Sequence, residues 1–214
     1  GVSAVAWEYL LNALSSKGMR ITSAMRMSVQ VLMSHLVWVL FGSFILESIL
    51  KPFFNSKESK WFKMKWDENW VWWAIGGYFA SCTLFSVAEL ANQFVGPRNV
   101  NFEGVVERMI NPEDKDVLAL GVGSLAPCFS APWWEEVLYR GFMLPALTLY
   151  LPKHIAVVAS AILFAAHHLS LLTFFPLSIL GLVWAVLYIK SGNLLVTIFI
   201  HAMWNSRVFL GSLW

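Results

Sequence analysis

The 214-residue chain is 58% hydrophobic and only 13% charged, whereas about a quarter of the residues in soluble domains are charged. Its 12 tryptophans and 16 phenylalanines are typical of proteins with long interfacial and lipid-facing surfaces. The net charge of +2, without a basic run that carries stacking aromatics, argues against a nucleic-acid partner. Strand-like alternation is absent, which argues against a membrane barrel. The composition therefore predicts an all-α, polytopic integral membrane bundle in contact with the lipid bilayer.

The chain begins with a short apolar stretch that is followed by basic residues. Residues 4–14 contain one glutamate among apolar residues, which predicts a helix lying along the membrane surface. We therefore expect an N-terminal interfacial segment over 1–26 and a single membrane helical domain over 27–214.

Two long apolar stretches follow this segment. Residues 27–50 and 71–94 are each long enough to cross a hydrocarbon core, which takes about 20 residues. The lysine-rich residues 51–68 between them predict a polar loop, and residues 97–116 predict a loop or a surface helix. Several aromatics at the far side of the polar loop predict a belt at headgroup level, namely Trp61, Phe62, Trp66, Trp70, Trp72 and Trp73.

The second half of the sequence predicts a membrane helix that is interrupted by prolines, followed by three more helices. Proline ends or kinks a helix but is tolerated at its first position. We therefore expect a glycine-rich span from Val117 to about Ser130, then a new helix from Pro132 to about Leu149. Further helices are expected at about 154–172, 176–189 and 193–210, with a tight turn over Lys190–Asn193 between the last two. This makes about six to seven membrane-embedded helices besides the interfacial one.

Three charged side chains stand in the apolar stretch 117–151. A charge at membrane depth costs about 2.5–3.5 kcal/mol and usually faces a cavity or another charge. Glu136 and Arg140 are four residues apart on one helix face, so we expect them to pair. Glu135 points about 100° away from Glu136 and has no cation nearby in sequence. We expect Glu135 to find its partner on another element.

Two later apolar stretches also carry polar side chains. His167 and His168 are adjacent in one of them, and His201 and Asn205 lie four apart on one face of the last helix. Inside the membrane, each of these polar groups needs another polar or charged group as its partner. A single polar site shared between helices is the arrangement that costs least.

This set of side chains suits hydrolysis. A desolvated carboxylate without an adjacent cation, here Glu135, can act as a general base toward water. A histidine can orient that water or protonate the leaving amine, and a second histidine with Asn205 can donate to a developing oxyanion. Two histidines and one or two glutamates would also be a plausible zinc set, but the adjacent Arg140 disfavours a bound cation and the spacing is not H-E-x-x-H. We expect no cofactor, and neither zinc nor chlorophyll is favoured.

The same residues stand in the order and spacing of three motifs: Glu135-Glu136-x-x-x-Arg140, Phe164-x-x-x-His168 and His201-x-x-x-Asn205. In these motifs, residues 117–210 resemble the CAAX-protease and bacteriocin-processing family of membrane proteins (the CPBP or Abi family). The resemblance implies an all-helical intramembrane fold with a water-filled cavity. It also implies metal-independent cleavage of a peptide bond in a membrane protein or peptide substrate, in eukaryotic members after a prenylated cysteine.

The resemblance further implies a role for each motif residue. Carried over by position, Glu135 is the general base, His168 its water-orienting partner, His201 and Asn205 the oxyanion pair, and Glu136 and Arg140 the braces of the motif helix. His167 lies outside the family pattern.

The residues around the first motif are most similar to those of plant, algal and cyanobacterial members, so we expect a multi-pass protein of the chloroplast thylakoid or inner envelope. Some of those members resemble scaffold-like proteins, which keeps two alternatives open. One is a non-catalytic scaffold or assembly factor for membrane protein (photosynthetic) complexes. The other is a pigment- or lipid-binding membrane subunit with His35, His154 or His167 as a magnesium-porphyrin ligand.

Overall fold

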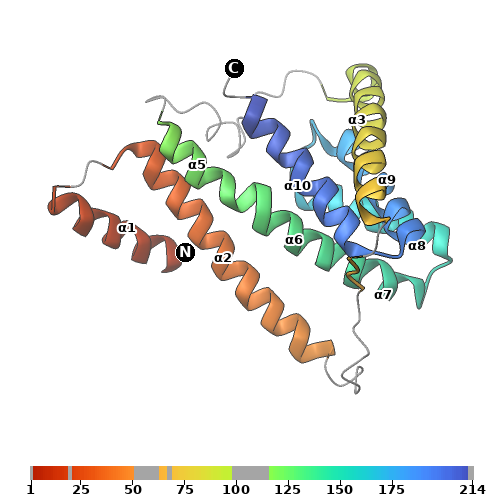
Figure 1. Cartoon of the computed structure of the whole chain (residues 1–214), viewed down its shortest axis with the longest axis horizontal. Coiled ribbons are helices and arrows are strands. Elements are labelled where there is room, and N and C mark those ends of the chain that lie inside the picture. The colour runs from red at the N-terminus through yellow and green to blue at the C-terminus, as the bar shows by residue number, and fades with distance from the viewer. Residues whose placement is uncertain (1, 19–20, 51–62, 67–68, 98–115, 212–214) are drawn as a thin grey trace. The chain divides into compact units, whose positions relative to one another are not determined.

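The computed structural model describes residues 2–18, 21–50, 63–66, 69–97 and 116–211, and every regular element in these ranges is a helix (Figure 1). In the described ranges, 5 helices are long and apolar enough to cross a membrane, and Lys153–His167 is a shorter apolar helix. The predicted all-α polytopic class is therefore confirmed. The expected loops over 51–68 and 97–116 lie largely outside the described residues.

The chain forms two compact units. One comprises Gly1–Asn55, Phe102–Trp134 and Ala202–Trp214, and the other comprises Ser56–Asn101 and Glu135–His201. We describe each unit by itself.

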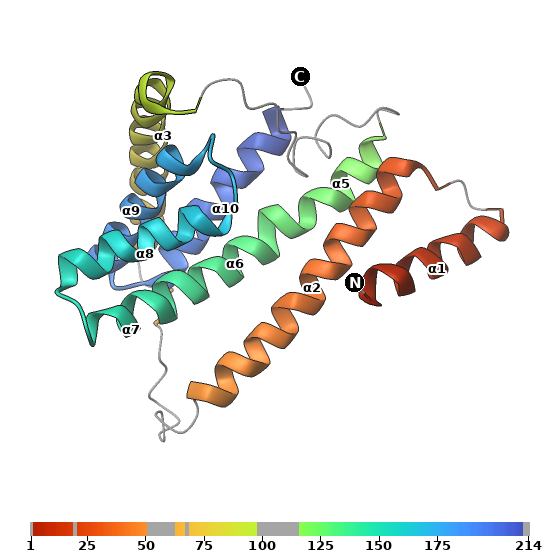
Figure 2. The same cartoon turned by 180° about the vertical axis from the view of Figure 1, so that it is seen from behind.

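The first unit contains α1 (Val2–Ser16), α2 (Ser23–Leu50) and α5 (Val117–Leu125). Helices α2 and α5 lie side by side in both views (Figures 1 and 2). The Thr22 hydroxyl accepts a hydrogen bond from the Met25 amide at 3.0 Å and donates to Asp116 Oδ2 at 2.6 Å, while Asp116 Oδ1 accepts from the Ala119 amide at 2.9 Å. These bonds cap both helices and join their N-terminal ends.

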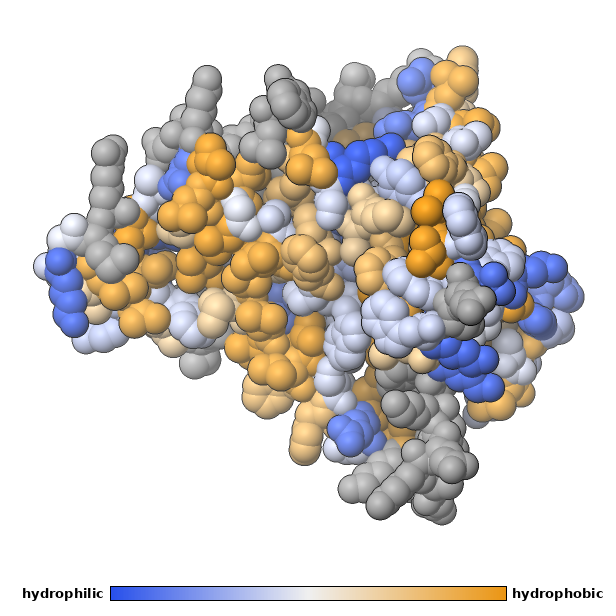
Figure 3. All heavy atoms as spheres, in the orientation of Figure 1, coloured by the Kyte–Doolittle hydropathy of each residue, from blue (hydrophilic) through white to orange (hydrophobic). Residues whose placement is uncertain are grey.

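Helix α2 exposes large apolar side chains along its second half. Only a few of its residues are buried, and large apolar side chains are exposed along it, as the orange surface over α2 in Figure 3 shows. A helix with so much exposed apolar surface is typical of one that faces lipid. The exposed members include Leu40, Phe41, Phe44, Ile45 and Ile49.

The expected break at Pro132 is wrong, because Val117–Thr148 is one helical run. Helix α5 continues through the π-helical segment η2 (Ala126–Ser130) into α6 (Ala131–Glu136). A second π-helical segment, η3 (Val137–Met143), leads into α7 (Leu144–Thr148). The wider turn of η2 stands directly before Pro132 and makes room for its ring, which would otherwise clash with the preceding turn.

The second unit contains α3 (Trp70–Val95), α8 (Lys153–His167), α9 (Phe174–Ser191) and the first part of α10 (Leu194–Gly211). Helix α9 packs against both α3 and α8, as Figure 2 shows. The predicted turn before α10 is confirmed, since Gly192 ends α9 in the left-handed conformation with φ of 60°. Glycine adopts this conformation without the steric cost that a side chain would add.

Small residues bring the helices of the second unit close together. A Cβ atom at Gly181 of α9 would lie 3.2 Å from the Ala161 backbone of α8, and one at Gly77 of α3 would lie 2.5 Å from Ile200 Cδ1 of α10. Helix α8 ends at His167, earlier than the predicted 172. His168 follows it in a turn, and Leu169 has a φ of 52°.

Candidate active site

The predicted pair of Glu136 and Arg140 is confirmed, and both side chains are almost completely buried. Arg140 Nη1 donates to Glu136 Oε1 at 2.9 Å, and Arg140 Nη2 donates to the Gly181 carbonyl of α9 at 3.0 Å. The guanidinium carbon lies 4.7 Å from the ring centre of Phe164 and 5.5 Å from that of Trp184. The charge of Arg140 is thus matched by a carboxylate, a carbonyl and two aromatic faces.

His201 of α10 forms a hydrogen bond with the same carboxylate. Its Nδ1 lies 3.0 Å from Glu136 Oε1. Since Glu136 is paired with Arg140 it is a carboxylate that can only accept, so the proton of this bond sits on His201 Nδ1. In the neutral imidazole the other nitrogen, Nε2, then carries the lone pair. The ring of Trp184 lies against the imidazole, with centroids 4.3 Å apart and an interplanar angle of 38°.

Glu135 faces the free side of the same imidazole. Its Oε2 lies 3.9 Å from His201 Nε2, which is too long for a hydrogen bond. This oxygen is buried and accepts no hydrogen bond from the described part of the chain. One bridging water can span such a distance. The expectation that Glu135 meets a partner on another element fits this placement beside α10.

His168 stands at the end of α8, next to this cluster. Its Nδ1 lies 2.9 Å from the Phe164 carbonyl, and since a carbonyl only accepts, Nδ1 carries the proton. Its Nε2 is therefore the nitrogen that is available as an acceptor. The charge of Glu135 and the ring of His201 both act on His168 electrostatically.

Phe164 lies at the centre of the cluster, although no role was expected for it from the sequence. Its ring centre lies 4.9 Å from that of His168, 6.0 Å from that of His201 and 5.7 Å from that of Trp184. Trp184 was missed as well, and its Nε1 donates to the Ser81 hydroxyl of α3 at 3.0 Å. The motif Phe-x-x-x-His contained a signal for Phe164, whereas nothing in the sequence singled out Trp184 or Ser81.

Asn205 lies in the first unit, unlike the other six named residues of the three motifs. Its Nδ2 donates to the Pro127 carbonyl at 2.7 Å. Pro127 is in η2, where the π-helical turn changes the normal pairing of carbonyls with amides. Asn205 thus has a backbone partner within the first unit.

The histidines proposed as pigment ligands have different surroundings. His35 Nδ1 lies 3.0 Å from the Ser130 hydroxyl within the first unit, and the ring of His167 lies 6.1 Å from that of Tyr139. His154 is exposed at the start of α8. Over the described ranges, no three His, Cys, Asp or Glu side chains come together in a group that could hold a metal ion.

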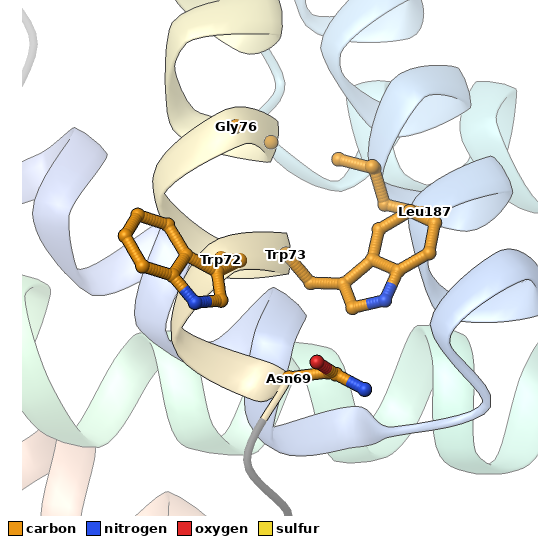
Figure 4. A pocket seen from close by; sticks show the side chains of 6 residues that line it. Asn69, Trp72, Trp73, Gly76 and Leu187 are labelled. Atoms are coloured by element: carbon orange, nitrogen blue, oxygen red, sulfur yellow. The ribbon is translucent and has the colours of Figure 1, made fainter.

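The aromatic residues at the start of α3 line a separate groove of about 330 Å³ (Figure 4). Figure 4 shows the rings of Trp72 and Trp73 on either side of the helix, with Asn69 below them and Leu187 of α9 beside Trp73. None of the motif residues lines this groove. The ring of Trp70 packs instead on Trp66 and Phe199, with centroids 5.3 and 4.9 Å apart.

The comparison with protein families agrees with the motif geometry. Residues 117–207 match the family model described as type II CAAX prenyl endopeptidase Rce1-like. No significant match was found among the curated proteins or among the solved structures. The matched region contains Glu135, Glu136, Arg140, His168, His201 and Asn205. Over these residues the chain is similar to the Rce1-like family of type II CAAX prenyl endopeptidases, which agrees with the resemblance of its three motifs to the CAAX-protease and bacteriocin-processing family.

Proposed function

We propose that this protein is a metal-independent intramembrane endopeptidase in which Glu135 activates a water molecule. The observation that carries the proposal is the 3.9 Å separation of Glu135 Oε2 and His201 Nε2, with the carboxylate oxygen buried and without a hydrogen bond from the described residues. Both atoms are acceptors when His201 carries its proton on Nδ1. A water held between them would donate to both and turn its oxygen lone pairs toward a substrate carbonyl.

The proposed reaction begins when this water attacks the carbonyl carbon of the scissile peptide bond. The new C–O bond forms as the water proton passes to Glu135, and the carbonyl oxygen becomes an oxyanion. The tetrahedral intermediate then collapses by breaking its C–N bond, and the proton held by Glu135 passes to the leaving nitrogen. The products are a carboxylic acid and an amine, and transfer of the acid proton to the amine gives a carboxylate and an ammonium group.

The neighbouring Glu136 is not suited to the role of base. Its Oε1 accepts from both Arg140 and His201, so this carboxylate is held by two donors. We assign Glu136 and Arg140 to positioning His201, which agrees with the bracing role implied by the family resemblance. In this scheme His201 shares the water with Glu135, which differs from the oxyanion role that the family resemblance implies for His201. The charge of Glu135 acts on His168 electrostatically. The oxyanion role of Asn205, which lies in the first unit, is implied by the family resemblance alone.

The test is cleavage of a farnesylated peptide that ends in a C-a-a-X sequence, the substrate class that the family match suggests. Glu135→Gln keeps the shape of the side chain and removes the base. We expect a loss of about 10²–10⁴-fold in kcat with an unchanged thermal unfolding midpoint. Glu89→Gln, on the exposed side of α3, is the matched control and is expected to cleave like the wild type. Equal cleavage by the wild type and Glu135→Gln would refute the proposal.

A scaffold role is the second candidate function, and the groove beside the exposed Trp72 is the observation that favours it. In that case the partner is a membrane protein complex, and the residues around the first motif suggest the chloroplast membrane as its compartment. The double variant Glu135→Ala, His168→Ala would then still restore function in a deletion strain. Loss of function in that variant, at wild-type abundance, would reject the scaffold role.

A further inference from the structure

A groove between α8 and α9 combines a basic end with apolar walls. It has a volume of about 780 Å³, which lies within the range of about 300–1,000 Å³ that is usual for small-molecule sites. Lys153 and His154 line it from the start of α8, and Lys190 lines it from the end of α9. None of its lining residues is a motif residue, so it is distinct from the candidate active site.

The basic residues gather at one end because α8 and α9 pack side by side and run in opposite directions. Lys153, the first residue of α8, therefore lies at the same end as Lys190, which is near the last residue of α9. Both lysines and His154 are exposed, and none of them forms a hydrogen bond or ion pair with the residues that the structure describes. No acidic residue lines the groove.

The walls become apolar one helical turn from this end. Val157 follows Lys153 by four residues on α8, and Val186 precedes Lys190 by four residues on α9, so each valine lies on the same face as its lysine. Leu182 continues the apolar wall by a further turn of α9. The order along the groove is therefore positive charge first and then about two turns of hydrocarbon surface.

This order matches an amphiphile with a negative headgroup. Basic residues at the level of the headgroups attract anionic lipids, and each lysine contributes about five-fold to binding. We infer that the α8–α9 groove is a binding site for one anionic phospholipid, with the phosphate between Lys153 and Lys190 and an acyl chain along Val157, Leu182 and Val186. A zwitterionic lipid carries no net charge to balance the two lysines.

The experiment measures lipid retention by the purified full chain in native mass spectrometry after reconstitution with phosphatidylglycerol or phosphatidylcholine. We expect one retained phosphatidylglycerol, and about 25-fold weaker retention in Lys153→Gln, Lys190→Gln. The matched control, Lys17→Gln, Lys63→Gln, makes the same change of charge at two exposed lysines outside the groove and is expected to retain lipid like the wild type.

A third variant separates the apolar wall from the charges. Val186 is exposed on α9, so Val186→Trp fills the groove without disturbing the core and is expected to displace the lipid while both lysines remain. This variant also tests the site if the double lysine variant does not fold. Equal retention of the two lipids, or equal retention by the wild type and Val186→Trp, would overturn the proposal. Displacement of the lipid by inorganic phosphate alone would also overturn it, because the acyl chain would then contribute nothing.

Discussion

Glu135 and Glu136 are adjacent residues of α6 with the same side chain, yet their surroundings differ. Glu136 is completely buried and accepts hydrogen bonds from Arg140 and His201, at 2.9 and 3.0 Å. Glu135 keeps about 13% of its side chain exposed, and its Oε2 faces His201 Nε2 at 3.9 Å without a hydrogen bond from the described residues. The Oε2 of each carboxylate is buried without a hydrogen bond from the described residues. The difference is that two donors hold Glu136 through its Oε1, whereas the Oε2 of Glu135 faces an imidazole nitrogen.

The difference teaches how a buried charge can serve structure or chemistry. A carboxylate that is paired and hydrogen-bonded is held as an anion and positions its neighbours. A carboxylate with an unused lone pair, next to an imidazole, can take a proton from water. Substitutions on the Glu136 side should therefore affect mainly stability, and substitutions at Glu135 should affect mainly activity.

The largest expected effect on stability comes from breaking the ion pair of Glu136 and Arg140. Arg140→Met leaves Glu136 buried without its cation and should lower the free energy of unfolding by about 3–5 kcal/mol. Removing both charges, in Glu136→Gln, Arg140→Met, should cost less than removing the arginine alone, because no uncompensated charge remains. Reversible unfolding in mixed micelles measures both variants.

The exposed ion pair in the first unit is the control for this prediction. Arg26 Nη1 lies 3.0 Å from Glu8 Oε1, and an exposed pair contributes about 0–1 kcal/mol. Arg26→Met should therefore change stability by no more than that amount. Losses of equal size in Arg26→Met and Arg140→Met would contradict the contrast between the two pairs.

A smaller effect is expected where α9 approaches the cluster. In Gly181→Ala, the new Cβ would lie 3.0 Å from Phe164 Cδ1 and 3.2 Å from the Ala161 backbone, so Phe164 must shift. We expect a loss of about 1–3 kcal/mol in unfolding free energy and reduced cleavage. In Gly121→Ala, a Cβ meets nothing within 4 Å, so this variant should be at least as stable as the wild type.

The positioning of His201 by Trp184 should have a still smaller effect. Ser81→Ala removes the acceptor of the Trp184 Nε1 hydrogen bond, at 3.0 Å, and should cost about 1 kcal/mol of stability. Because Trp184 lies against His201, we also expect a lower kcat with little change in KM. Thr83→Ala, which removes an exposed hydroxyl from the same helix, should leave both quantities unchanged. A change in KM alone would show that Ser81 acts on substrate binding instead.

The smallest effect is expected at Asp116, which caps the N-terminal end of α5. The hydrogen bonds from the Thr22 hydroxyl and from the Ala119 amide lower the pKa of Asp116 below its ordinary value of 3.8. A lowered folded-state pKa means that the carboxylate stabilises the fold above about pH 4 and that this stabilisation is lost as the pH falls through the folded-state value. The difference in unfolding temperature between the wild type and Asp116→Ala should therefore shrink below pH 4. A difference that is constant with pH would contradict this assignment.

Much of the fold follows from sequence patterns, and the errors have local causes. The long apolar runs gave α2 and α3 to within a few residues, and the Lys190–Asn193 turn was placed correctly. The break at Pro132 was wrong because rules for proline assume an α-helical ladder, and the π-helical turn of η2 is set by packing rather than by composition. The early end of α8 at His167 was missed because Leu169, Leu171 and Leu172 continue the apolar stretch beyond the helix.

The sequence by itself determined that the chain is a helical membrane protein, that Glu136 and Arg140 can pair, and which polar residues need partners in lipid. These properties depend on composition and on spacing along a single helix. Only the tertiary structure decided that His201 bonds Glu136 on one side and faces Glu135 on the other, and that Phe164, Trp184 and Gly181 surround the arginine. Such contacts join α6, α8, α9 and α10 across long separations in the chain, and no local pattern fixes how these helices pack.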